Sequence, residues 1–299
     1  RLLSIAIQMV NTSSNGIILI DEIEQGLEPD RVQHLVKTLK NYSNYQFIFT
    51  THSSNVVTEL GVSDLCIMRR KANRLLDIPK TIAMQKCVRH NSEALFARKI
   101  IIGEGATEVG LCRALNDDRM TNGKESMSYL GIKILDGTGN SAVEYAEALN
   151  KLGFKIAFLC DSDEANTNLK KQSLKDMGVA VFDCEEGKAI EEQIFDNLTW
   201  NGIKNCLNFY IKKKETNIKG LYEQVYPDKQ KDYTEDWLEK DTVELRQLFG
   251  KRAKKKSWYK DVTSGMFLGS EIFSNINNMD EKCHLRQLLT NLSVWIDND

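Results

Sequence analysis

The stretch KIIIGEGATEVGL (residues 99–111) places a short apolar run before a glycine-rich turn and a segment of helical spacing. Apolar runs of this length are typical of strands buried on both faces of a parallel sheet. The same order then recurs along the chain, with GIKIL before SAVEYAEALNKLG, KIAFLCDSD before NLKKQSLKDMG, and VAVFD before AIEEQIF. This alternation predicts an α/β fold in which helices cover a Rossmann-like parallel sheet.

Acidic residues follow two of these predicted strands. Glu104 comes directly after residues 99–103 with Glu108 four positions later, and Asp161 and Asp163 follow the strand that starts at residue 155. Parallel strands expose their carboxyl ends at one edge, so we expect the four carboxylates to share a crevice. Such a cluster needs cations, and oxygen-only ligands favour Mg²⁺ or Mn²⁺. Alternatively, Glu104 is a helix N-terminal charge and Asp161 and Asp163 are capping residues.

An earlier segment, GIILIDEIEQGLEPDR (residues 16–31), predicts a separate site. An apolar strand that ends in Asp21 and Glu22 is the pattern of a magnesium-binding acid followed by an acid that polarises the attacking water. QFIFTTHS (46–53) predicts a neighbouring strand that ends near His52, where a γ-phosphate could be sensed. The structural alternative is a buried strand with two acids at its end and a capping or core histidine.

Length, net charge and composition limit the kinds of protein that this sequence can encode. The length of 299 residues indicates about two domains, and 40 basic against 42 acidic residues leave a net charge of −2. Any DNA contact therefore needs a local basic patch. No apolar run approaches the roughly 18–20 residues of a membrane span, and no signal peptide is visible, although the chain opens at Arg1 in mid-pattern. Seven cysteines without metal-site spacing suit a reducing cytosol, so we expect a cytoplasmic protein.

Residues 1–70 resemble the C-terminal lobe of an ABC-type ATPase of the SMC/RecF group. RLLSIAIQMV (1–10) would then be the helix after the signature motif, Asp21 and Glu22 the Walker B pair, Glu28-Pro29-Asp30 part of the D-loop, and His52 the switch histidine. The Walker A pattern G-x-x-x-x-G-K-[ST] does not occur in the chain and is expected upstream. The resemblance implies that ATP binds only together with that N-terminal half, between two heads.

Residues 95–200 resemble the Toprim fold of topoisomerases, primases and certain nucleases. Glu104 and Glu108 match its E-G-x-[ST]-E pattern, with Gly103 at a position that is usually apolar, and Asp161 and Asp163 match its D-x-D. DGTGN (136–140) matches its glycine-rich turn, although any fold can use glycine in a turn. An ATPase lobe followed by Toprim resembles the OLD (overcoming lysogenization defect) nucleases, which include the Gabija nuclease subunit and retron-associated members.

That resemblance implies a metal-dependent DNA endonuclease or nickase regulated by the ATPase domain, with a role in anti-phage defence. Glu104, Asp161 and Asp163 would hold one ion, and Glu108, Glu191 and a shared Asp the second; Glu192 and Glu185 are alternatives to Glu191, and a solvated helix face is the structural alternative. One ion would activate water and the other would stabilise the leaving 3′ oxygen. The expected cofactors are therefore a pair of Mg²⁺ or Mn²⁺ ions, with ATP at the first site.

The basic segment KRAKKKSWYK (251–260) follows the acidic residues. The resemblance implies a lysine that completes the site, for which Lys256 is the first choice, Lys260 the second and Lys255 the third. The same segment, with Trp258 and Tyr259 interleaved, could also track a DNA backbone through Lys254, Lys255 and Lys260.

The expected domains are an ATPase lobe (1–75), a linker (76–94), the Toprim nuclease core (95–200) and a mostly helical, basic C-terminal extension of the nuclease domain (201–299). Expected partners are double-stranded DNA, further copies in a homodimer or homotetramer, and a helicase-like or reverse-transcriptase defence protein. The main rival is an SMC/RecF-like DNA-binding ATPase with a non-catalytic Toprim module. A Toprim primase, a RecR-like mediator and a scaffold protein are further alternatives.

Overall fold

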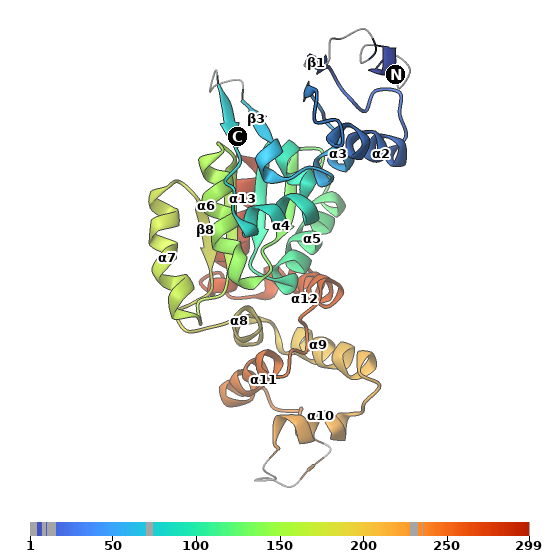
Figure 1. The fold of residues 1–299 in the computed structure, drawn as a ribbon. Coiled ribbons are helices and arrows are strands. Elements are labelled where there is room, and N and C mark those ends of the chain that lie inside the picture. The colour runs from blue at the N-terminus through green and yellow to red at the C-terminus, as the bar shows by residue number, and fades with distance from the viewer. Residues whose placement is uncertain are drawn as a thin grey trace. The chain divides into compact units, whose positions relative to one another are not determined.

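The computed structural model describes residues 5–7, 10, 16–69, 74–227, 233–234 and 236–298. The chain folds into two compact units, residues 1–97 and 98–299 (Figure 1). Residues 5–7 and 10 are helical, as predicted for RLLSIAIQMV, and the rest of that segment lies outside the described residues. Within the described ranges, no helix combines the length and apolar character needed to cross a membrane.

Two parallel strands form the centre of the first unit. Strand β1 (Ile17–Ile20) pairs with β2 (Gln46–Phe49), so that Ile20 lies opposite Phe49 and both strands end at the same edge. Helix α2 (Pro29–Lys40) begins with proline at its first turn, where no amide donor is needed, and α3 (Ser54–Thr58) follows β2. The buried faces of these elements share one core, made by Ile18, Ile20, Val32, Leu35, Val36, Leu39 and Val56.

The segment predicted as a linker is folded instead. Strands β3 (Cys66–Met68) and β4 (Leu75–Asp77) form an antiparallel pair, followed by α4 (Ile82–His90) and the 3₁₀ turn η2 (Ser92–Phe96). Thr81 caps α4 by accepting a hydrogen bond from the Met84 amide at 3.1 Å. The prediction of a linker over 76–94 is wrong because α4 buries one face, formed by Ala83, Met84, Cys87 and Val88.

The second unit is built on a four-stranded sheet in the order β6-β5-β7-β8, and all its neighbouring strands are parallel. The strands are β5 (Lys99–Gly103), β6 (Ile132–Asp136), β7 (Lys155–Cys160) and β8 (Ala180–Asp183). Gly103 at the end of β5 lies opposite both Asp136 and Leu159. The parallel α/β sheet predicted from the apolar runs is confirmed.

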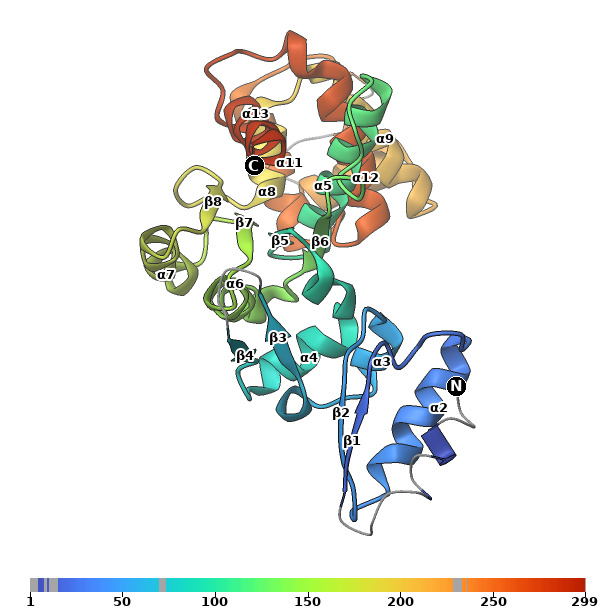
Figure 2. The ribbon, with the colours of Figure 1, turned by 90° about the horizontal axis from the view of Figure 1, so that it is seen from above.

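Helices cover both faces of this sheet. Helices α6 (Ala142–Lys151) and α7 (Ala165–Asp176) lie on one face, and α5 (Ala106–Thr121) and α13 (His284–Asp297) lie on the other (Figure 2). The short helix α8 (Ile190–Asn197) follows β8. Each crossover therefore returns the chain to the same edge of the sheet, where the acidic residues stand.

The C-terminal region is helical and belongs to the same unit as the sheet. Its helices are α9 (Trp200–Lys213), α10 (Ile218–Val225), α11 (Val243–Lys255), α12 (Val262–Asn275) and α13. Trp258 and Tyr259 are completely buried, and both their rings lie near Tyr210. The two aromatic residues interleaved in the basic segment therefore form part of the core.

Glycines allow α12 to lie unusually close to α5. A Cβ atom on Gly110 would stand 2.5 Å from the Val262 carbonyl oxygen, and one on Gly265 would collide with the Thr107 carbonyl and stand 3.0 Å from the Gly110 Cα. Thr107 also donates a hydrogen bond to the Tyr259 carbonyl at 3.1 Å. This glycine seam, defined as Gly110 and Gly265, ties the start of α5 to the segment that carries Lys260.

Candidate active site

The ends of β5 and β7 bring the first pair of acids together. The Glu104 amide donates to the Leu159 carbonyl at 2.9 Å, and the Asp161 amide donates to Glu104 Oε2 at 3.0 Å. Glu104 therefore accepts a hydrogen bond from the backbone of the D-x-D segment. The sequence-based expectation that Glu104 lies beside Asp161 agrees with this geometry.

Gly103 explains how Glu108 reaches the same place. A Cβ atom on Gly103 would stand 2.9 Å from the Val109 nitrogen and 3.0 Å from the Glu108 Cβ, so only glycine lets α5 start this close to the strand end. Glu108 lies in the first turn of α5, is 2% exposed, and accepts a hydrogen bond from the Gly105 amide at 2.9 Å. The glycine that departs from the usual motif thus brings the first turn of α5 close to the strand end.

The predicted glycine-rich turn supports Glu104 from the other side. The Gly137 amide donates to the Gly103 carbonyl and the Gly139 amide to the Glu104 carbonyl, both at 2.8 Å. Thr138 and Gly139 have φ angles of 51° and 65°, a left-handed conformation that glycine adopts without strain. The turn therefore does more than reverse the chain, because it fixes the backbone on both sides of the Glu104 Cα.

Of the three glutamates considered on or before α8, Glu191 alone points into the buried site. Its side chain is 0% exposed, and within the described residues neither carboxylate oxygen accepts a hydrogen bond, although Lys260 Nζ lies 3.2 Å from Oε1. Glu192 instead accepts from the Ala189 amide at 3.0 Å and caps the helix, and Glu185 pairs with Lys188. The geometry favours Glu191, the first choice from sequence.

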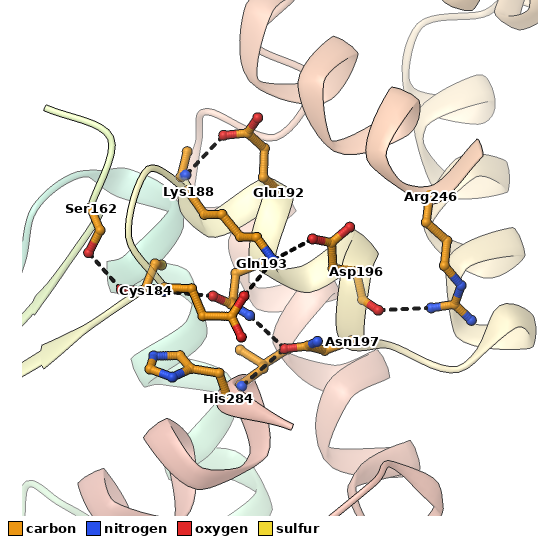
Figure 3. A network of polar contacts seen from close by, with 12 residues as sticks. Ser162, Cys184, Lys188, Glu192, Gln193, Asp196, Asn197, Arg246 and His284 are labelled. Atoms are coloured by element: carbon orange, nitrogen blue, oxygen red, sulfur yellow. Dashed lines mark hydrogen bonds and ion pairs between the residues drawn. The ribbon is translucent and has the colours of Figure 1, made fainter. Parts of the chain in front are cut away.

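A polar network holds the loop that leads into α8 (Figure 3). Ser162 donates its hydroxyl hydrogen bond to the Cys184 carbonyl at 2.7 Å, and the Glu185 amide donates to Gln193 Oε1 at 2.8 Å. The Gln193 amide group, which is fully buried, donates to Asn197 Oδ1 at 2.6 Å. The Ile190 amide also donates to Asp161 Oδ1 at 2.7 Å, so the network joins the D-x-D segment to the start of α8.

The structure brings a different set of lysines to the acids from the one expected. Lys254 forms an ion pair with Asp163 and lies 3.7 Å from Glu192, and Lys260 pairs with Glu191. Lys256 and Lys255 are exposed, and none of the interactions found between described residues joins either of them to the carboxylates. The structure places Lys260, the second choice, beside the acids and not Lys256, because Lys256 lies past the end of α11 with its side chain in solvent.

In the first unit, Asp21, Glu22 and His52 lie at the ends of two adjacent parallel strands. Thr50 donates to Asp21 Oδ1 at 2.5 Å and accepts from the Glu22 amide at 2.8 Å. The His52 amide donates to Glu24 Oε1 at 2.6 Å. Sequence reasoning missed Thr50 and Glu24, whose side chains tie the two strand ends together. The strand-end placement expected for a Walker B pair and a switch histidine agrees with this geometry.

Comparisons with known families find a match in each of the two units. Residues 1–58 match the family model described as AAA domain, putative AbiEii toxin, Type IV TA system. Residues 95–163 match the model described as overcoming lysogenization defect protein-like, TOPRIM domain. A comparison with curated proteins found no match. Residues 95–163 are thus similar to the TOPRIM domain of OLD-like proteins. Together with the ATPase-like region before it, this domain is consistent with an OLD-family nuclease.

The TOPRIM site raises the pKa values of its acids. Burial, together with the negative charges of Glu108 and Glu191, raises the pKa of Asp161 to about 8. Burial and the charge of Glu191 raise the pKa of Glu108 to about 7. Burial also raises the pKa of Glu104, against the lowering effect of the Asp161 amide. The charge of Lys260 already lowers the pKa values of Asp161 and Glu108, and a further positive charge close to them would favour their ionised forms.

The donor set of the TOPRIM site fits a hard divalent cation. Asp163 Oδ1 and Glu191 Oε2 are buried without a hydrogen bond or ion pair from the described residues, and such orphaned carboxylate oxygens are what Mg²⁺ or Mn²⁺ would bind. Among the described side chains, no three His, Cys, Asp or Glu residues already stand at metal-ligand spacing. Lys254 and Lys260 occupy one side of Asp163 and of Glu191, and each is on a flexible stem that can turn away.

The raised pKa values give the TOPRIM domain a defined pH dependence. The pKa values of Asp161 and Glu108 both exceed the value of about 4 that a carboxyl group has in an unfolded chain. The folded state therefore holds extra protons between about pH 4 and 8, and the stability from these groups is complete below that window and lost as the pH rises through it. Groups with a lowered pKa, such as Asp297 beside Arg119, change the pH dependence of stability only below about pH 4, where they become protonated.

We expect the urea midpoint of the protein in EDTA to fall between pH 5 and pH 8. The variant Asp161→Asn should flatten this dependence, because asparagine does not titrate. Mn²⁺ should restore the midpoint at pH 8, since it neutralises the ionised acids. Urea unfolding followed by circular dichroism at each pH measures all three, and a midpoint that rises with pH in EDTA would contradict the burial of these acids.

Proposed function

We propose that residues 98–299 form a divalent-metal-dependent DNA endonuclease or nickase, regulated by the ATPase region that precedes it. The observation that carries the proposal is a pair of buried carboxylate oxygens without a partner among the described residues, Glu191 Oε2 and Asp163 Oδ1, beside the linked pair Glu104 and Asp161. Leaving buried polar atoms unpaired is costly unless a ligand completes them. Carboxylates from the ends of β5 and β7 and from the first turns of α5 and α8 converge here, and this donor set supports phosphoryl chemistry.

Each residue then has a defined role. Glu104, Asp161 and Asp163 would bind one divalent ion, and Glu108 and Glu191, sharing Asp161, the second. Bound ions of this kind activate water and stabilise the leaving oxygen in phosphodiester hydrolysis. Glu104 and Asp161 are held by backbone hydrogen bonds, so their carboxylates are pre-oriented. Lys260, whose side chain is 42% exposed, can turn from Glu191 to a DNA phosphate and offset its negative charge.

The proposed substrate rests on the charges beside the site, and the proposed biological role rests on the family resemblance. Lys254 and Lys260, which lie beside the carboxylates, suit a polyanion, and double-stranded DNA is the substrate that we propose. Regulation by ATP rests on Asp21, Glu22 and His52 in the ATPase-like region. A role in anti-phage defence, within a homodimer or homotetramer or with a helicase-like or reverse-transcriptase partner, is proposed from the resemblance to OLD nucleases.

A plasmid assay tests the proposed activity. The 299-residue protein is incubated with supercoiled plasmid and Mg²⁺ or Mn²⁺, with EDTA as the matched control. The expected result is conversion to open-circular or linear DNA only with the divalent ion. DNA binding without cutting under Mg²⁺, Mn²⁺ or Ca²⁺ would contradict the proposal and would support the rival, a DNA-binding ATPase with a non-catalytic TOPRIM module.

The two candidate lysines differ in their expected effects. We expect Lys260→Met to lower the cleavage rate by about 10²–10³-fold, the usual loss when a donor that stabilises developing charge is removed. Lys256→Met should leave the rate within about twofold, because Lys256 is exposed beyond α11. Single-turnover plasmid cleavage measures both rates. A larger loss for Lys256→Met than for Lys260→Met would return the role to Lys256.

A further inference from the structure

A buried lysine that the proposed mechanism does not use lies beneath the D-x-D segment. Lys171, in the middle of α7, is only 5% exposed. Its Nζ donates to the Asp161 carbonyl and to Ser162 Oγ, each at 2.7 Å, and lies 3.4 Å from Asp183 Oδ2. The three N–H donors of the ammonium group therefore meet three oxygen atoms, so the group is satisfied despite its burial.

These contacts join two neighbouring strand ends. Asp161 and Ser162 follow β7, and Asp183 ends β8. Ser162 accepts from Lys171 and donates onward to the Cys184 carbonyl at 2.7 Å, and its own amide donates to the Lys188 carbonyl at 2.9 Å. The carbonyl that Lys171 holds belongs to Asp161 itself, whose side chain faces Glu108 and Glu191.

We infer that Lys171 is a positioning residue for the metal ligands: it fixes the backbone of Asp161 and Ser162, and so the direction of the Asp161 and Asp163 carboxylates. Lys171 is not expected to touch DNA or the reacting phosphate, because its side chain is buried beneath the turn that follows β7. It acts through Asp161 and Ser162. The inference rests on the proposed function, since it assigns a supporting residue to that same site.

The test compares Lys171→Met with Lys170→Met. Methionine keeps the length of the stem and removes the charge and the donors, and Lys170 is the exposed neighbour on the same helix. Mn²⁺ binding is measured by titration calorimetry, and plasmid cleavage is measured over a range of Mn²⁺ concentrations. Removing a residue that orients metal ligands typically weakens metal affinity by about 10–100-fold. We expect that loss for Lys171→Met and none for Lys170→Met.

Two further readouts separate positioning from a general loss of structure. For Lys171→Met, the KM for DNA should stay unchanged and saturating Mn²⁺ should restore most of kcat. Ser162→Ala removes one acceptor of the Lys171 ammonium and should also weaken Mn²⁺ binding, but by a smaller factor. If circular dichroism shows that Lys171→Met does not fold, the Mn²⁺ affinity of Ser162→Ala is the deciding measurement.

Several results would overturn the inference. Equal Mn²⁺ affinity in Lys171→Met and Lys170→Met would do so, and so would a lowered kcat that saturating Mn²⁺ does not recover in a folded variant. If Lys171→Met is unfolded, wild-type affinity in Ser162→Ala overturns it. If the wild-type protein neither binds Mn²⁺ nor cuts plasmid, the proposed function itself fails and the inference falls with it, a pattern distinct from a loss confined to Lys171.

Discussion

Asp161→Asn is expected to lower plasmid cleavage by about a thousandfold or more while making the protein more stable in EDTA. The loss of activity follows because Asp161 is the carboxylate that both proposed ion sites share, and a bound ion contributes several kcal/mol of transition-state stabilisation. The gain in stability follows because Asp161 is buried beside Glu108 and Glu191, whose charges oppose its own ionisation. The two effects have opposite signs, which a simple folding defect cannot produce.

Asparagine removes the charge of Asp161 and keeps its shape. Its Oδ1 can still accept the hydrogen bond from the Ile190 amide, which lies at 2.7 Å, so the start of α8 keeps its anchor. Single-turnover cleavage at saturating Mn²⁺ and urea unfolding at pH 8 in EDTA are the two measurements. As a matched control, Asp176→Asn removes an exposed carboxylate at the end of α7 and should change neither. Cleavage at the wild-type rate in Asp161→Asn would remove Asp161 from the site.

Gly265→Ala is expected to lower the free energy of unfolding by about 1–3 kcal/mol or more, the usual cost of forcing extra volume into a packed contact. The new methyl group would collide with the Thr107 carbonyl, which is backbone and cannot rotate away. For a unit of this size each kcal/mol lowers the melting temperature by about 2–4 °C. Ser270→Ala, on the exposed side of the same helix, is the control and should change the melting temperature little.

The same substitution should also weaken activity beyond its effect on stability. Separating α12 from α5 moves Tyr259, which accepts a hydrogen bond from Thr107, and with it the adjacent Lys260. We therefore expect cleavage by the folded fraction of Gly265→Ala to fall toward that of Lys260→Met. Thermal unfolding and cleavage at 20 °C below the melting temperature of the variant separate the two effects. A stable, fully active Gly265→Ala protein would show that the glycine seam does not position Lys260.

Much of the second unit could be predicted from the sequence because its strands are buried on both faces. Such strands must be continuous apolar runs, and acids placed after them must meet at one edge of the sheet. Glu104 and Asp161 were therefore predictable as neighbours. In the first unit, the predicted linker failed where a signal existed: Ala83, Met84, Cys87 and Val88 have the spacing of one helical face.

The lysines were harder because their roles depend on tertiary packing. Lys170 and Lys171 are adjacent in a polar helix, and only the position of α7 against the sheet decides which one is buried. The position of Lys254 also depends on packing. It lies four residues after Gly250, where a Cβ would approach the Glu192 Cα to 2.8 Å, so both face α8. Trp258 and Tyr259, in contrast, sit in a basic run that resembles a surface segment.

Anomalous diffraction from crystals of the protein soaked in Mn²⁺ tests the convergence of the carboxylates most directly. The predicted result is manganese density bounded by Glu104, Asp161 and Asp163, with a second peak toward Glu108 and Glu191, and with the Lys254 and Lys260 side chains turned away from those acids. Manganese density elsewhere on the protein with this site still closed by its lysines would contradict the assignment of a metal-dependent nuclease.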